Sequence, residues 1–478
     1  MKTIPSARER EFAAVGLILA IIFITRLYHI GTPPIEIEES WRQGDTESIA
    51  RNFAEYRFNI LYPNFNYDGP LPNVPALEFQ VTTFIIAVLY KTFGHSYFLA
   101  RLIPVCFFML SALFLYLISR KYMGIAGAAF SLISYGALPI NIYYSRAIMP
   151  ESAGLMFFTG GFYFFDKWFT TGKSRFLVLS SLFTSLAIMT KPITIFIGIP
   201  MLYVCFRETG WKWLTRMDVW AYAVSTLGLA LLYYSLSIPL AEFKYSLGLT
   251  QSVLMKRIPM SIKDPASYLF ILKRFPKLLS PPGIVLAAIG IFTIRKEQRV
   301  ILVWFLAMAL EVLLVVSAIR IYYYLIFFAV PCSLLIGKGL KSLYEWPYTR
   351  TFSTAVLFTL FLSCFITVKP MYRINTVMQA QIMVVEKLVK SDELIISGSF
   401  DPGLLSISGR RGWRFNIKAG KYKTPYEELN HYIRNGAKYF VPIHGIIYRD
   451  VKGELLEYLD RNYEKIEIVE GYPIYRLK

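Results

Sequence analysis

Cysteine and histidine are both scarce in this chain, which has four of each among 478 residues. The cysteines lie inside apolar runs and none form a close pair, so we expect small core residues rather than a disulfide framework or a zinc site. The histidines are scattered, which argues against a histidine-based metal site. These residues are Cys106, Cys205, Cys332, Cys364, His29, His95, His431 and His444.

Charged residues are also few, at 17% of the chain, whereas 55% of the residues are hydrophobic. Soluble chains are about 45–50% apolar, so this excess indicates a membrane protein. The 51 Lys and Arg outnumber the 32 Asp and Glu, which gives a net charge of +19. The positive-inside bias of a multispanning protein explains such an excess, and anionic lipid or an anionic acceptor is the alternative. No nucleic-acid-binding module is recognisable, so nucleic acid is not an expected partner.

Long apolar stretches recur along the first three quarters of the chain, each close to the length that crosses a hydrocarbon core of about 30 Å. The first follows a basic start and lacks a small-residue cleavage site, so we expect a retained helix at 12–30. The sequence therefore predicts an all-α polytopic membrane protein with about eleven transmembrane helices. The later predicted spans are 98–119, 124–144, 152–169, 176–190, 193–207, 219–238, 281–295, 299–317, 322–337 and 351–369.

The charges of the connecting loops predict the orientation. With a cytoplasmic N-terminus, every predicted inside loop is basic, as the positive-inside rule requires. This count requires that 76–93 does not span, and we expect it to be an amphipathic or re-entrant helix at the outer surface. Two large outer loops are then expected, at 31–97 and at 239–280. The inside loops carry Arg120/Lys121, Lys173/Arg175, Arg207/Lys212/Arg216, Arg295/Lys296/Arg299 and Lys338/Lys341/Arg350.

The composition changes after Lys369, where strand-like and helix-like segments alternate. "DELIISGS" is typical of a strand, and "YEELNHYIRNGAKYFVPI" and "GELLEYLDRNYEKIEIV" each of a helix followed by a strand. We therefore predict a membrane domain over 1–369 and a small extracytoplasmic α/β domain over 370–478.

The first outer loop concentrates acidic residues. Residues 31–80 hold eight of the 32 acids of the chain but only three basic residues. A solvated loop is one explanation, and a carboxylate site at the membrane surface is the other. In "DTESIARNFAEY" apolar residues recur at helical spacing, which predicts a short surface helix with Asp45 near its N-cap. A capping role and a catalytic role for Asp45 both remain open at this point.

Three further charged residues lie at predicted outer helix ends. Glu151 follows Pro150, Lys191 precedes Pro192, and Arg320 begins "RIYYYLIFFAVP". Charges at membrane depth are costly and usually line a cavity or pair with each other, although cations also extend to the interface. Because these groups and Asp45 are expected on one side of the membrane, they could together hold a phosphate and activate a nucleophile.

In these segments the chain resembles the GT-C superfamily of polyprenyl-phosphate-sugar-dependent glycosyltransferases, in the branch of protein O-mannosyltransferases and lipid A aminoarabinose transferases. The resemblance covers roughly residues 10–340. It rests on the order of "GDTESIARNFAEY", "YDGPLPNVPALEFQVTTFIIAVLYKTFGHSYFLARL", "SRKYMGIAGAAF", "YYSRAIMPES", "LAIMTKPITIFIGIP" and "RIYYYLIFFAVP".

The resemblance implies a role for each site residue. Asp45 corresponds to the acid near the acceptor, the general base, and Asp68 and Glu151 to further acidic positions. Lys191 and Arg320 correspond to positions that face the donor phosphate. The chain departs from aminoarabinose transferases at Asp68-Gly69-Pro70, where they have Glu-Lys-Pro, and this departure argues against a strict assignment to them.

The expected function is inverting sugar transfer from a polyprenyl-phosphate donor to a lipid, glycan or protein acceptor outside the inner membrane. A divalent metal, which some branches use, is permitted but not required. Membrane lipids are expected partners and a monomer is the expected state. A transporter or lipid flippase is the rival class, but no paired hydrophobic halves are found. An inactive scaffold relative is a third possibility.

Overall fold

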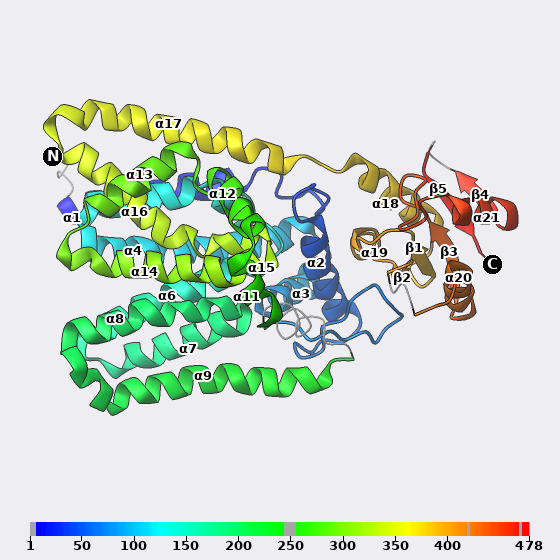
Figure 1. Cartoon of the computed structure of the whole chain (residues 1–478), viewed down its shortest axis with the longest axis horizontal. Coiled ribbons are helices and arrows are strands. Elements are labelled where there is room, and N and C mark those ends of the chain that lie inside the picture. The colour runs from blue at the N-terminus through cyan, green and yellow to red at the C-terminus, as the bar shows by residue number, and fades with distance from the viewer. Residues whose placement is uncertain (1–5, 243–254, 418–420, 468–470, 478) are drawn as a thin grey trace.

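The computed structural model describes residues 6–242, 255–417, 421–467 and 471–477. A bundle of helices occupies the N-terminal part, and a small sheet with helices forms the C-terminal region, residues 376–476 (Figure 1). The N-terminus lies at the end of the bundle far from the C-terminal region. The helices up to the bundle's last are α1 (Ala7–Arg26), α2 (Ser40–Glu55), α3 (Val81–Phe93), α4 (Tyr97–Ala137), α5 (Pro139–Tyr144), α6 (Glu151–Thr171), α7 (Ser174–Thr190), α8 (Gly198–Thr209), α9 (Met217–Ser237), α11 (Met255–Lys263), α12 (Pro265–Leu279), α13 (Pro281–Phe292), α14 (Arg299–Glu311), α15 (Ser317–Ile319), α16 (Ala329–Glu345) and α17 (Arg350–Val368).

Each predicted span overlaps a helix, and the chain is a multi-pass membrane protein. By length and composition, five helices of the described residues qualify as spans. A sixth is possible where α12 and α13, bent by 95°, form one broken span. The count of eleven stays a prediction. Spans 98–119 and 124–144 belong mostly to α4, which is interrupted at Gly124, a residue with φ of 71°.

One predicted boundary is corrected by the structure. Residues 322–326 form a 3-10 turn and α16 begins only at Ala329, so the predicted start of span 322–337 is wrong. This turn is both apolar and aromatic, and hydropathy cannot distinguish such a turn from a helix. The predicted loop 239–280 contains α11 and α12, while its residues 243–254 lie outside the described residues.

Segment 76–93 forms α3, a helix of 13 residues that packs against α2. At about 1.5 Å per residue such a helix is too short to cross a hydrocarbon core. Both α2 and α3 lie at the end of the bundle nearest the C-terminal region (Figure 1). The first loop therefore places two helices across the end of the bundle.

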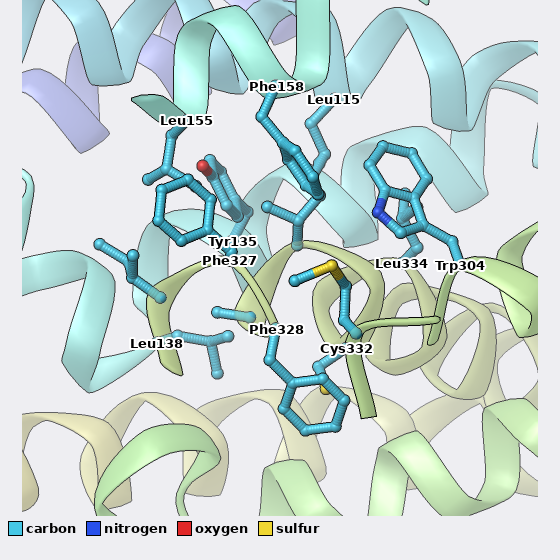
Figure 2. Packing of buried hydrophobic residues seen from close by; sticks show 14 of the residues in the cluster. Leu115, Tyr135, Leu138, Leu155, Phe158, Trp304, Phe327, Phe328, Cys332 and Leu334 are labelled. Atoms are coloured by element: carbon cyan, nitrogen blue, oxygen red, sulfur yellow. The ribbon is translucent and has the colours of Figure 1, made fainter. Parts of the chain in front are cut away.

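The core of the bundle is aromatic and aliphatic, with side chains from α4, α6, α14 and α16 meeting in its centre (Figure 2). Phe158 and Trp304 lie edge to face, with ring centroids 5.5 Å apart. The backbones of α13 and α16 also approach closely. A Cβ added to Gly290 of α13 would lie 2.0 Å from the carbonyl oxygen of Leu335 in α16. Only glycine fits there, and this position fixes how α13 and α16 cross.

The C-terminal region holds a five-stranded sheet in the order β2-β1-β3-β5-β4. β1 is parallel to β2 and β3, and β5 is antiparallel to β3 and β4. The predicted strands and helices are present, but α18, α19 and β2 were not predicted. The domain boundary at residue 369 stays a prediction. The elements are α18 (Thr376–Leu388), β1 (Leu394–Ser397), α19 (Gly403–Ser408), β2 (Arg411–Arg414), α20 (Pro425–Arg434), β3 (Ala437–Val441), α21 (Glu454–Asn462), β4 (Glu464–Glu467) and β5 (Pro473–Arg476).

A buried ion network fixes the first loop to the bundle. The Glu36 carboxylate accepts hydrogen bonds from Arg101 of α4 at 2.9 Å and from Arg146 at 2.7 Å. All three side chains are inaccessible to solvent. Arg101 also donates to the side chain of Gln43 at 2.9 Å, which ties α2 to the same network.

Removing the central charge should destabilise the protein strongly. Glu36→Gln leaves two buried guanidinium groups without their counter-charge, and breaking a buried pair in this way costs about 3–5 kcal/mol. We expect a large fall in the melting temperature of the detergent-solubilised protein. Glu454→Gln, an exposed carboxylate in α21, is the control and should leave the melting temperature unchanged. Equal melting temperatures for the two variants would contradict this account of the network.

Candidate active site

A cavity of about 460 Å³ lies where α2 crosses the end of the bundle. Its walls come from distant parts of the chain: the start of α2, the turn before it, the end of the first loop, the turn after α7, α12, and the turn before α16. The lining residues are Ile37, Glu38, Glu39, Trp41, Arg42, Asp45, Leu77, Glu78, Lys191, Arg274, Arg320, Ile321, Tyr322, Tyr323 and Tyr324. Three of the five predicted site residues, Asp45, Lys191 and Arg320, therefore line one cavity.

The charges of this cavity are balanced between four carboxylates and four cations. Several are paired, because Arg42 contacts Glu78 and Lys277 holds Glu38 at 2.7 Å. Paired charges in a partly dry cavity are oriented by their partners instead of by water. The carboxylates are Glu38, Glu39, Asp45 and Glu78, and the cations are Arg42, Lys191, Arg274 and Arg320.

Asp45 lies inside α2, and only 3% of its surface is exposed. Its carboxylate accepts hydrogen bonds from the Tyr67 hydroxyl at 3.1 Å and the Ser406 hydroxyl at 3.3 Å. Burial raises the pKa of Asp45 to about 7, although the Arg42 charge and the Tyr67 hydrogen bond oppose this rise. A carboxyl with this pKa can both accept and release a proton near neutral pH.

The expectation that Asp45 lies near the N-cap of a helix is wrong. The helix begins five residues earlier, at Ser40, and its N-cap is Glu39. The helical spacing of the apolar residues gave no signal for that start, because the first turn faces the cavity with polar and charged side chains. Asp45 is therefore a mid-helix side chain directed into a site.

Glu39 is a site residue that sequence reasoning missed. It lines the cavity from the N-cap of α2, in a left-handed conformation with φ of 57° that is strained for a residue other than glycine. Burial, and then the negative charges of Glu38 and Glu151, raise the pKa of Glu39 to about 7. The acidic run "EIEES" was visible in the sequence, but nothing in it showed which acid enters the site.

Glu151 and Lys191 form a pair at the back of the cavity. The Lys191 ammonium lies 2.5 Å from the Glu151 carboxylate, and both side chains are almost fully buried. Lys191 lines the cavity, whereas Glu151 lies behind it as the first residue of α6. Lys191 also lies 5.4 Å and 5.2 Å from the ring centroids of Tyr323 and Tyr324. The geometry thus makes Glu151 a partner that orients Lys191.

Arg320 lines the cavity from the end of α15. Its backbone is left-handed, with φ of 58°, and its guanidinium binds Asp264 and donates to the Ser267 hydroxyl at 3.1 Å. These two partners belong to the start of α12. Arg320 is 42% exposed on its side chain, so it remains accessible to a ligand in the cavity.

Asp68 does not join the other predicted residues. Its carboxylate accepts two hydrogen bonds from Arg414 of β2, at 3.0 Å and 2.6 Å, and it does not line the cavity. The partner is 346 residues away in the chain, so no local pattern indicated the pairing. The geometry gives no support to a catalytic role for Asp68 and makes it a link to the C-terminal region.

The acids of the cavity do not gather into a metal site. Within the described ranges, no group of three or more His, Cys, Asp or Glu side chains is placed to hold a metal ion. Glu38 and Glu78 are each directed toward a cation. The residues present therefore do not fit a divalent metal.

The C-terminal region touches the site directly. α19 packs on α2, where a Cβ on Gly44 would lie 3.1 Å from the Ile407 side chain. The backbones of Gly69 and Gly412 pair across the two parts, with the amide of Gly69 donating at 3.1 Å. Ser406 of α19 hydrogen-bonds Asp45, so the C-terminal region helps to set the environment of this carboxylate.

A family model described as dolichyl-phosphate-mannose-protein mannosyltransferase matches residues 80–237, which include Glu151 and Lys191. No curated protein matches the chain. Among solved structures, ArnT from Cupriavidus metallidurans in the apo state has a TM-score of 0.64 at 11% identity, covering 96% of this chain and 97% of that one.

The chain has the GT-C fold of ArnT. ArnT from the same organism bound to undecaprenyl phosphate has a TM-score of 0.62 at 11% identity and covers 98% of both chains. An Archaeoglobus fulgidus oligosaccharyltransferase complex with Zn and sulfate has a TM-score of 0.56 at 12% identity, covering 89% of this chain and 67% of that one. These similarities confirm a GT-C fold of the protein mannosyltransferase and ArnT type. Together with the family match, they support a membrane glycosyltransferase.

The raised pKa of Asp45 predicts a pH-dependent gain in stability when its charge is removed. The folded state keeps a proton up to about pH 7 that an unfolded aspartate releases near pH 4, so this group lowers the free energy of unfolding as pH rises between these values. Asparagine cannot ionise. Asp45→Asn should therefore melt above the wild type at about pH 8, by a gap that narrows below about pH 7 and closes near pH 4.

The control for this measurement is Asp392→Asn, which changes an exposed aspartate of the same charge. It should show no such gap at either pH. A difference in melting temperature between Asp45→Asn and the wild type that does not change with pH would contradict the burial argument.

Proposed function

We propose that this GT-C protein transfers a sugar from a polyprenyl-phosphate donor to an acceptor at the face of the membrane where the C-terminal region lies. One observation carries the proposal. A single cavity at the end of the bundle combines four cations with two carboxyl groups, Asp45 and Glu39, whose pKa values lie near 7. A departing phosphate needs the cations to stabilise its negative charge. A hydroxyl nucleophile needs one of the two carboxyl groups to accept its proton.

The cations suit the departing phosphate. When the bond between the sugar and the lipid phosphate breaks, negative charge grows on the phosphate oxygens. Lys191 and Arg320 both line this cavity, and Arg274 adds a third cation from α12. Charge stabilisation by fixed groups in a partly dry site is stronger than in water and needs little reorganisation.

Asp45 suits the role of general base. In one displacement, an acceptor oxygen bonds to the anomeric carbon as the bond to phosphate breaks, the proton of the acceptor hydroxyl passes to the Asp45 carboxylate, and polyprenyl phosphate leaves. A single displacement inverts the anomeric centre. The proposed base works best with a pKa near the operating pH, and burial of Asp45 supplies that value. An acceptor that is itself a phosphate would need no base.

The location follows from the same arrangement. The N-terminus and the C-terminal region lie at opposite ends of the bundle (Figure 1). Basic residues in the predicted inside loops favour a cytoplasmic N-terminus. We infer that the site and the C-terminal region are extracytoplasmic, in an inner membrane, and that the acceptor is a glycolipid, a polysaccharide or a protein.

Sugar transfer should depend on Asp45. Loss of a general base lowers a rate by about 10²–10⁴-fold, so Asp45→Asn should lose at least 100-fold in transfer of radiolabelled sugar from a polyprenyl-phosphate donor pool to membrane acceptors. The acidic limb of the wild-type rate should have an apparent pKa near 7, and activity should fall below it.

Two comparisons sharpen this test. Glu39→Gln separates the two carboxyl groups, because a larger loss in this variant than in Asp45→Asn would assign the base to Glu39. Asp392→Asn is exposed and distant from the cavity, and it should transfer sugar at the wild-type rate. Absence of transfer by the wild type from every polyprenyl-phosphate donor would overturn the proposed function itself.

A further inference from the structure

A second cavity, of about 230 Å³, lies between the first loop and the C-terminal region. The loop contributes Asp68 and the residues that follow it, and the C-terminal region contributes β2 and α20. Its side chains include Asp68, Trp413, Arg414, Lys421, Tyr422 and His431. The reaction proposed above uses none of them.

The lining combines aromatic rings with hydrogen-bonding and charged groups. The rings of Trp413 and Tyr432 are stacked, with centroids 5.0 Å apart, and Tyr422 lies edge-on to Tyr432 at 6.2 Å. The Asp68–Arg414 pair supplies fixed donors and acceptors beside these rings. Polar groups beside aromatic faces suit a pyranose, whose C–H faces pack on rings while its hydroxyls form hydrogen bonds.

The two cavities share a thin wall. The Arg414 guanidinium, which lines the second cavity, lies 4.5 Å from the ring centroid of Tyr67 and 5.6 Å from that of Trp41. Trp41 lines the first cavity, and the Tyr67 hydroxyl hydrogen-bonds Asp45. A molecule in the second cavity is therefore one layer of side chains away from the proposed base.

The charge of the second cavity is positive. Arg414 is matched by Asp68, whereas Lys421 adds a further cation at the exposed edge of the cavity. An acidic substituent on the sugar would be attracted to this edge.

We propose that this second cavity binds a saccharide unit of the acceptor, with Lys421 favouring a unit that carries a carboxylate. The inference rests on the proposed function, because it assigns the acceptor of the same site. The bound unit holds the acceptor beside the Trp41–Tyr67 wall of the first cavity.

Binding can be measured without transfer. The probes are trigalacturonate and the neutral maltotriose, titrated by calorimetry into the purified full chain in detergent without donor. We expect trigalacturonate to bind, and to bind more tightly than maltotriose. Tyr422→Ala should weaken its binding by roughly tenfold, equivalent to about 1.4 kcal/mol. Tyr426→Ala is the matched control, because Tyr426 lies outside the cavity and packs on Tyr458 instead.

The outcomes separate the two proposals. No binding of either saccharide by the wild type, or equal losses in Tyr422→Ala and Tyr426→Ala at matched melting temperatures, would overturn the saccharide site. Equal affinity for the two saccharides would overturn the role of Lys421. Binding that persists in Asp45→Asn supports a site separate from the base. If the wild-type protein binds saccharide but transfers no sugar, the proposed function is overturned and the saccharide site stands.

Discussion

The site depends on a buried carboxylate that is not part of it. Glu36 holds two arginines from separate parts of the bundle, and one of them, Arg101, also holds Gln43 of α2. This network ties α2 to the end of the bundle. Asp45, Arg42 and the strained turn at Glu39 take their positions from α2. α19 packs on the same helix, so the placement of the C-terminal region depends on it too.

The charges around the cavity follow a single physical rule. A carboxylate in a dry site either finds a cation or takes up a proton. Glu38, Glu78 and Glu151 each have a cation within 4 Å, whereas Asp45 and Glu39 respond with pKa values near 7. Within the first group, Glu151 orients Lys191, one of the cations proposed to meet a phosphate. The second provides proton acceptors at neutral pH, at some cost in stability.

Much of the fold was predictable, because long apolar runs and positive charges between them report membrane helices directly. The placement of Lys191 and Arg320 at one cavity was predictable for the same reason, since both lie at the same ends of their helices. The start of α16 was not, because the aromatic turn before it is as apolar as a helix. The start of α2 was missed because its first turn is polar and faces a cavity.

The contacts between distant segments were beyond the sequence. Asp68 was expected among the catalytic residues but binds Arg414 of β2, a strand that was itself not predicted. Arg42 and Arg274 line the cavity, yet each is one arginine among many in a strongly basic chain. Only the crossing of α2 over the bundle shows which charges meet. Local pattern gives the type of a residue and its position in an element, but not the partner that determines its chemistry.

A structure of the detergent-solubilised protein with bound polyprenyl phosphate would test the central claim most directly. The account predicts phosphate density in the cavity below α2, within hydrogen-bonding distance of Lys191 and of at least one of Arg274 and Arg320. The Asp45 carboxylate should face the open space beside that phosphate. Phosphate bound elsewhere on the protein, with this cavity filled only by solvent, would contradict the assignment of the site.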